Sequence, residues 1–274
     1  MAWIDYRDNA DYKVYATHVT SAGGIATGWP VNGLRLATTA KAQYDPKVTA
    51  DGAGGAIVAW SDERNGIDAD IYAQRVSGAG AVVSGWPVNG FKACGASGEQ
   101  YQPAISSIGA SGAYLAWTDD RNGSPDVYAI RLTAAGAVAA GWTANGRRGC
   151  AAALEQNSPI AVTMPDNGLV IGWNDLRSGS NYDIYAQRRT LGGAIASGWV
   201  ANGVSVVTAP ADQTDPSIVP DAAGGLYVTW NDSRKVVDDD AAHSLRMLSN
   251  SRWRRAGRPM ASVSAPWPAT SSTP

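Results

Sequence analysis

The sequence repeats itself about every 57 residues, and this periodicity limits the fold more than any other feature of the chain. The register is carried by a series of tryptophans spaced by 57, 57, 56 and 57 residues: Trp3, Trp60, Trp117, Trp173 and Trp230. A second series keeps the same period: Trp29, Trp86, Trp142 and Trp199. Each member of the second series is followed by an Asn-Gly pair and then by a Gln-x-x-Pro motif. A constant period of this order is the signature of an array of similar supersecondary units.

Each repeat predicts four short β-strands. After Gln-x-x-Pro comes a short apolar segment, then a Gly-Gly turn and a nearly continuous apolar run, as in GAIVAW at 55–60. Such a run indicates a strand that is buried on both faces. The third segment mixes apolar and polar residues, as in DIYAQRV at 70–76. The fourth lies near the Asn-Gly pair, which supplies the positive φ angles of a tight turn.

Four antiparallel strands per repeat predict an all-β fold, and burial on both faces favours the four-stranded blades of a β-propeller. Separate sandwich-like modules are the alternative. The 11 Trp, 11 Tyr and 31 Gly also favour strands and tight turns over helices. Reading from tryptophan to tryptophan gives four units, 3–59, 60–116, 117–172 and 173–229, and the start of a fifth.

The two ends of the chain depart from this pattern. Because the first repeat opens inside an expected strand, we expect residues 1–234 to be part of a larger ring, with open strand edges that permit self-association. Residues 235–274 are rich in Arg, Ser and Pro and show no strand alternation, which predicts a disordered or aberrant tail. An out-of-frame reading of the next repeat would produce the same break.

Composition excludes two broad classes of partner. The formal net charge is −2 at pH 7 and the basic residues are spread through the repeats, so we expect no nucleic-acid binding. No run approaches the roughly 18 apolar residues of a membrane span, and the N-terminus has no signal-peptide pattern. Cys94 and Cys150 occupy the same place in successive repeats, which favours two buried small residues over a disulfide.

The motif W-x-D-x-R looks like a site because it concentrates charge, but it recurs in all five copies. Function usually breaks repeat symmetry, so we interpret the aspartate and arginine as an ion pair that fixes a turn beside the tryptophan. Arginines that converge on a carboxylate or sulfate ligand are the alternative. The residues with the structural role are Trp3, Asp5, Arg7, Trp60, Asp62, Trp117, Asp119, Trp173, Asp175, Arg177, Trp230, Asp232 and Arg234.

The loop after this motif varies between copies, and variation on a fixed scaffold is where ligand contact is expected. The candidate binding residues are Tyr12, Arg64, Asn65, Ile67, Arg121, Asn122 and Tyr182. The carboxylates of this loop also suggest Ca²⁺, but their spacing does not match a calcium loop and Lys13 takes one of the positions. We therefore expect turn-capping side chains and no cofactor or metal.

Catalytic motifs are scarce in the sequence. Glu99 and Glu155 are repeat equivalents, Glu63 has no clear partner, and His18 and His243 are isolated. A glycosidase needs two carboxylates in distinct environments, and nothing in the sequence singles out such a pair. The Gly-Trp series invites comparison with sugar-stacking indoles, but an identical position in each unit favours wedges between blades.

Taken together, W-x-D-x-R, D-[IV]-Y-A-[QI]-R, G-W-x-x-N-G and Q-x-x-P resemble a repeat of large secreted or surface proteins of bacteria, sometimes labelled propeller or sialidase-like. The resemblance covers residues 1–234. The first copy departs from it at Lys13 and His18, the third at Ile130, and the sialidase Asp-box S-x-D-x-G-x-T-W is absent.

The resemblance implies an extracellular or cell-surface location. On these grounds we interpret the chain as a non-catalytic binding or scaffold module for a glycan or protein. A sialidase-like glycoside hydrolase and a purely structural repeat fragment are the alternatives.

Overall fold

The computed structural model describes residues 1–234, 243–247 and 253–255, and these residues form five antiparallel sheets. The first sheet has three strands, β1 (Ala2–Asp5), β2 (Lys13–Ala16) and β3 (Leu34–Arg35). The second contains β4 (Gln43–Ala50), β5 (Ala56–Asp62), β6 (Asp70–Val76) and β7 (Phe91–Cys94). The third contains β8 (Gln100–Ser107), β9 (Gly112–Asp119), β10 (Asp126–Thr133) and β11 (Arg147–Arg148). The fourth contains β12 (Gln156–Thr163), β13 (Leu169–Asp175), β14 (Asp183–Arg189) and β15 (Val204–Val207).

The fifth sheet is formed by β16 (Gln213–Pro220), β17 (Leu226–Asp232), β18 (His243–Met247) and β19 (Trp253–Arg255). Strands β18 and β19 lie inside the segment that the sequence predicts to be disordered or aberrant. A strand edge such as that of β17 exposes backbone N–H and C=O groups that pair with any extended segment, whatever its side chains. Residues 235–242, 248–252 and 256–274 lie outside the described part, and so does the prediction for them.

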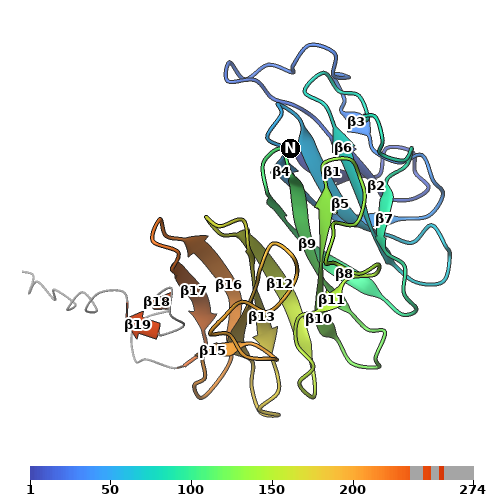
Figure 1. Cartoon of the computed structure of the whole chain (residues 1–274). Helices are drawn as coiled ribbons and strands as arrows, with labels where there is room; N and C mark the ends of the chain where they lie inside the picture. The colour runs from blue at the N-terminus through green and yellow to red at the C-terminus, as the bar shows by residue number, and fades with distance from the viewer. Residues whose placement is uncertain (235–242, 248–252, 256–274) are drawn as a thin grey trace, which may run out of the picture.

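The sheets follow one another along an arc (Figure 1), and consecutive strands within each sheet are hydrogen-bonded neighbours. The innermost strands β4, β8, β12 and β16 pack against one another in that order. Four-stranded antiparallel sheets arranged in this way are the blades of a β-propeller, so the predicted fold class is confirmed. The sheets of the described residues do not close into a ring, since β1–β3 and β16–β19 lie at opposite ends of the arc.

The blades begin at Gln-x-x-Pro rather than at the tryptophans. The glutamine is the first residue of each inner strand, at Gln43, Gln100, Gln156 and Gln213. The first sheet lacks such a strand, because β1 corresponds to the second strand of the other blades and pairs only with β2. The motif that the sequence places at the end of a unit therefore opens the next blade.

Tryptophans of both series hold the blades together. Trp60, Trp117 and Trp173 are fully buried between sheets. Trp86 lies in the loop after β6 and its Nε1 donates to the carbonyl of Ala134 in the next blade at 2.9 Å. A Cβ at Gly136 would lie 3.0 Å from the Trp86 ring, so a glycine is needed where the two blades meet. The Gly-Trp series therefore forms wedges between blades.

The part of the chain that the structure describes contains no helix long and apolar enough to span a membrane.

Candidate active site

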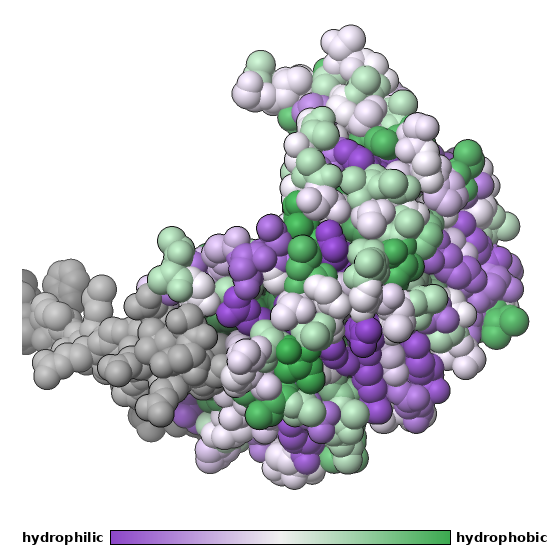
Figure 2. All heavy atoms as spheres, in the orientation of Figure 1, coloured by the Kyte–Doolittle hydropathy of each residue, from purple (hydrophilic) through white to green (hydrophobic). Residues whose placement is uncertain are grey.

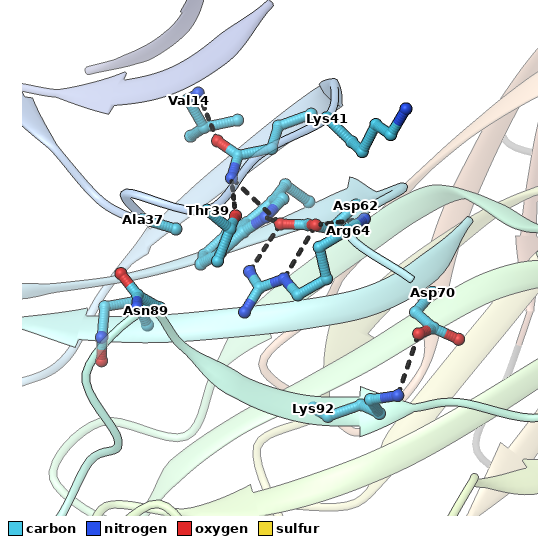
Figure 3. Close-up of polar contacts among 12 residues, drawn as sticks. Val14, Ala37, Thr39, Lys41, Asp62, Arg64, Asp70, Asn89 and Lys92 are labelled. Atoms are coloured by element: carbon cyan, nitrogen blue, oxygen red, sulfur yellow. Dashed lines mark hydrogen bonds and ion pairs between the residues drawn. The ribbon is translucent and has the colours of Figure 1, made fainter. Parts of the chain in front are cut away.

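The repeated Trp-Asp-Arg motif forms a closed hydrogen-bonded cluster, which we call the clamp (Figure 3). In the second sheet, Trp60 Nε1 donates to Asp62 at 2.8 Å, and Arg64 donates to the same carboxylate through Nε at 2.8 Å and Nη2 at 2.5 Å. Gln43 Nε2 supplies a further donor at 3.0 Å. The guanidinium of Arg64 lies over the Tyr72 ring, 3.6 Å from its centroid. The Asp62 carboxylate is therefore fully engaged within the protein, and the Nε and Nη2 groups of Arg64 are used to hold it.

The clamp recurs in every described copy. Trp117 Nε1 and Trp173 Nε1 each donate to the following aspartate at 2.7 Å. Hydrogen bonds from Arg234 hold the pKa of Asp232 well below its usual range, and those from Arg7 do the same for Asp5. The aspartate–arginine pairs of the five clamps are Asp5–Arg7, Asp62–Arg64, Asp119–Arg121, Asp175–Arg177 and Asp232–Arg234.

Clamps also connect neighbouring blades. Gln43 Oε1 accepts the backbone N–H of Val14 in the preceding sheet at 2.9 Å. Cys94 lies 3.0 Å from Arg121 Nη2 of the next blade, and Cys150 lies 3.1 Å from Arg177 Nη2. Both cysteines are buried and free, as the repeat equivalence indicates. Burial raises the pKa of the Cys94 thiol to about 12.

The predicted binding residues are spread over the loops after the second strand of each blade. Arg64 and Arg121 belong to clamps. Asn65 Oδ1 accepts the N–H groups of Ile67 and Asp68 at 2.9 and 3.1 Å and so caps its own turn.

The remaining members of that set differ in exposure. Asn122 donates to Asp126 at 2.9 Å, whereas the Ile67 side chain is 86% exposed. Tyr12 packs against Tyr44, and the hydroxyl of Tyr182 accepts from Asn157. A binding role for these residues stays a prediction.

Two of the loop carboxylates form ion pairs within the protein. Asp70 pairs with Lys92 at 3.0 Å (Figure 3) and Asp126 pairs with Arg148 at 2.7 Å. Lys13, which replaces the aspartate in the first copy, is buried and donates to the carbonyl of Thr39 at 3.1 Å. Among the described residues, no three histidine, cysteine or carboxylate side chains are grouped as metal ligands.

A different set of residues, which the sequence does not single out, meets at the inner strands. Each inner strand has a register shift that leaves the third and fourth residues of Gln-x-x-Pro out of the pairing with the next strand. The residue before the proline has a left-handed backbone, with φ of 51°, 52°, 50° and 52° at Asp45, Gln102, Ser158 and Asp215. Left-handed backbone at a residue other than glycine is uncommon and marks functional positions more often than others. We call these four the bulge residues.

The bulge residues line one hollow of about 600 Å³ at the centre of the arc. Figure 2 shows the concave side of the arc, toward which the inner strands face. Lys47 and the aliphatic groups of Pro103 and Ile160 complete much of its wall. The hollow therefore brings together side chains from four blades that are far apart in the sequence.

Hydrogen bonds between blades fix the backbone of this hollow. Ser158 N–H donates to Gln102 Oε1 of the preceding blade at 3.1 Å. Asp215 N–H donates to Asn174 Oδ1 of the preceding blade at 3.0 Å, and within the fifth sheet Asn231 Nδ2 donates to the Asp215 carboxylate at 3.1 Å. These bonds orient the bulge residues from outside the hollow.

Several polar groups in the hollow have no partner among the described residues. They are the carboxylate of Asp45, the amide Nε2 of Gln102, the hydroxyl of Ser158 and the ammonium of Lys47. Asp45, Lys47 and Gln102 are exposed, so these groups are open to water and to any ligand that enters the hollow.

Acidic residues surround the ends of the inner strands. Burial and the nearby carboxylates of Asp120, Glu155 and Glu99 raise the pKa of Tyr101 to about 12. Burial, together with Asp119, Glu99 and Glu155, raises the pKa of Asp120. Tyr101 directly precedes the bulge residue Gln102 near the start of β8, and we call the acidic residues around it the acidic rim.

The glutamates considered as catalytic candidates have local roles. Glu99 accepts the backbone N–H of Ala69 at 3.0 Å, and Glu155 accepts a hydrogen bond from the side chain of Asn157. Glu63 and Glu99 do not line the hollow. The two carboxylates that do are Asp45 and Asp215, and the only sequence signal for them is their place before the proline of Gln-x-x-Pro.

No protein-family model and no curated protein sequence matches the chain. Solved structures do match its fold. A Hadza microbial sialidase matches with a TM-score of 0.50 and 13% identity, over 89% of this chain and 53% of that one. The endo-arabinase of Bacteroides thetaiotaomicron matches with a TM-score of 0.45 and 13% identity, over 89% and 87%. The α-L-arabinofuranosidase of Fusarium graminearum matches with a TM-score of 0.48 and 15% identity, over 93% and 76%.

The similarity to the sialidase supports the propeller fold, and the chain spans about half the length of that protein. It also corrects the functional interpretation from the sequence. The non-catalytic binding or scaffold module is wrong as the main interpretation, because the solved structure that matches with a TM-score of 0.50 is a sialidase, which is a glycoside hydrolase. The motif symmetry that suggested a scaffold belongs to the clamps, whereas the hollow breaks that symmetry.

Proposed function

We propose that the chain is a glycoside hydrolase whose active site is the hollow between the inner strands. The observation that carries this proposal is the presence of two carboxylates, Asp45 and Asp215, in one hollow large enough for a sugar unit. Glycoside hydrolysis requires two carboxyl groups, one on each side of the scissile bond.

The surroundings of the two carboxylates suggest different roles. Asp215 accepts hydrogen bonds from Asn231 and Thr214, which orient its oxygens as proton acceptors. Asp45 has no hydrogen-bond partner among the described residues, so its carboxyl group can turn toward a leaving oxygen. Asp45 is therefore the proton donor to the leaving group, and Asp215 is the base that activates water.

The glycosidic enzymes that share the fold support the proposal, as does the convergence of unpartnered polar groups on the hollow. The proposal includes an extracellular or cell-surface location, as the sequence resemblance implies, because polymeric glycans are met outside the cell.

Hydrolysis of a panel of nitrophenyl glycosides by the full chain tests the proposal. Asp45→Asn and Asp215→Asn are each expected to lower kcat about 100-fold or more, because each removes one proton-transfer group. Asp166→Asn is the matched control, since it makes the same change in charge at the exposed turn at the other end of β12. Cleavage that survives both active-site substitutions, or no cleavage of any glycoside by the folded chain, overturns the proposal.

A further inference from the structure

We infer that the glycan bound in this hollow is neutral, and that sialic acids and uronic acids are excluded. This inference rests on the proposed function and names the class of its substrate. It is carried by the charges that line the hollow, by the engagement of the arginines, and by the acidic rim.

Among the described residues, the lining of the hollow holds more acidic than basic side chains. It contains the two aspartates Asp45 and Asp215 and one lysine, Lys47. A lysine ammonium is a point charge that lacks the planar pair of donors with which arginine holds a carboxylate. Even with Asp45 protonated as the proton donor, a carboxylate-bearing sugar would therefore meet the like charge of Asp215 and find no planar pair of donors to hold it.

None of the described residues that line the hollow is an arginine. The clamp arginines nearest to this end of the blades, such as Arg64 and Arg121, are each bound to a buried aspartate by two hydrogen bonds. Turning one toward a ligand would leave that aspartate buried and unpaired, which is far more costly than a ligand contact is favourable. Because the clamp arginines are held by their aspartates, they do not serve as carboxylate-binding residues in the hollow.

The rim adds to this exclusion. Glu99, Asp120 and Glu155 lie together beside Tyr101, the residue before Gln102 in β8, and their mutual repulsion contributes to the raised pKa of Asp120. A cluster of charges of one sign repels ligands of the same sign that approach the surface around it.

The free groups in the hollow suit hydroxyl groups instead. Ser158 and Gln102 offer neutral donors, Asp215 offers a strong acceptor, and the carboxyl group of Asp45 donates when it is protonated. A sugar hydroxyl both donates and accepts, so it satisfies these groups without bringing a charge into the site. The aliphatic wall formed by Pro103 and Ile160 matches the C–H groups of a sugar ring.

The test compares two sugars that differ only in charge. Galactose oligomers and galacturonate oligomers share the ring and differ by CH₂OH against COO⁻ at C6. With the full chain, we expect binding to the neutral oligomer to be about tenfold tighter or more, measured by calorimetry at low ionic strength. Added salt should narrow the difference, because it screens repulsion between charges near the surface. A parallel panel of nitrophenyl arabinosides, xylosides, glucosides, glucuronides and sialosides extends the comparison to cleavage.

Variants separate charge from shape. Asp215→Asn is expected to raise the affinity for the galacturonate oligomer relative to the galactose oligomer several-fold, because it removes one repelling charge. Asp166→Asn should leave this ratio unchanged. Cleavage or preferential binding of sialosides or uronides overturns the inference but leaves the proposed function standing. Failure to cleave any glycoside, neutral or acidic, overturns the proposed function itself, and the inference with it.

Discussion

The clamps and the bulge residues belong to the same blades, but their side chains differ in how closely they follow the sequence repeat. In the clamps both the backbone and the side chains repeat, from Asp5–Arg7 through to Asp232–Arg234. At the bulge residues the backbone repeats within 2° of φ, but the side chains change from blade to blade. We conclude that similar blades keep their arrangement through residues that are the same in every blade. A site can form at a position where the backbone is the same in every blade but the side chain differs.

Breaking a clamp should have the largest effect. Asp119→Ala is expected to lower the free energy of unfolding by about 3–5 kcal/mol, because it leaves Arg121 partly buried without its partner. Denaturant unfolding measures the change. Asp8→Ala, which removes an exposed ion pair with Arg35, is the control and should cost about 1 kcal/mol or less. Equal effects of the two substitutions would show that the clamp is not the stabilising unit.

Copies of the clamp should differ in strength. Asp5→Ala is expected to destabilise less than Asp119→Ala, because Asp5 is in the first sheet, which lacks an inner strand to cover it. The same denaturant series compares the two substitutions. A larger loss at Asp5 would contradict the idea that burial between blades makes the clamp strong.

Replacing a bulge residue with glycine should stabilise the folded chain and lower the activity of the site. Ser158→Gly is expected to raise the free energy of unfolding by up to about 1 kcal/mol, because glycine adopts a φ of 50° without strain. Hydrolysis should weaken at the same time, since the Ser158 hydroxyl faces the hollow. Thermal unfolding and kcat/KM measure the two effects. Ser97→Gly, on the exposed loop before β8, is the control.

The smallest effect concerns the acidic rim. Because the pKa of Asp120 is raised in the folded chain, its charged form is disfavoured there relative to the unfolded chain. Asp120→Asn should therefore raise Tm at pH 7, and the gain should fade as the pH falls through the ordinary aspartate pKa of about 4. A gain that is the same at pH 7 and pH 3 would point to a cause other than charge.

The sequence predicts most of the fold but little of the site. Three features of the sequence are enough to predict the blades: the period of the tryptophans, the apolar runs and the Asn-Gly turns. The strands and turns form from residues within one repeat, and the period shows that the same unit recurs. The hollow needs contacts between residues one repeat apart, such as Ser158 with Gln102, and no local pattern reports them.

The bulge residues are hidden for a second reason. A residue before proline normally has an extended backbone, so the sequence predicts ordinary β-strand conformation for Asp45 and Asp215. Their left-handed backbone arises from the register shift between the inner strand and its neighbour, as at Tyr44 to Lys47 opposite β5. The register shift depends on how the two strands pair, so it cannot be predicted from the Gln-x-x-Pro motif alone.

The two buried cysteines allow the opening of individual contacts between blades to be measured. Cys94 touches Arg121 across one seam of the propeller, and Cys150 touches Arg177 across the next. Burial raises the pKa of both thiols, so almost no reactive thiolate exists while the seams are closed. The rate at which an alkylating reagent labels each cysteine therefore reports how often its own seam opens, and the ratio of the two rates ranks the blades by local stability.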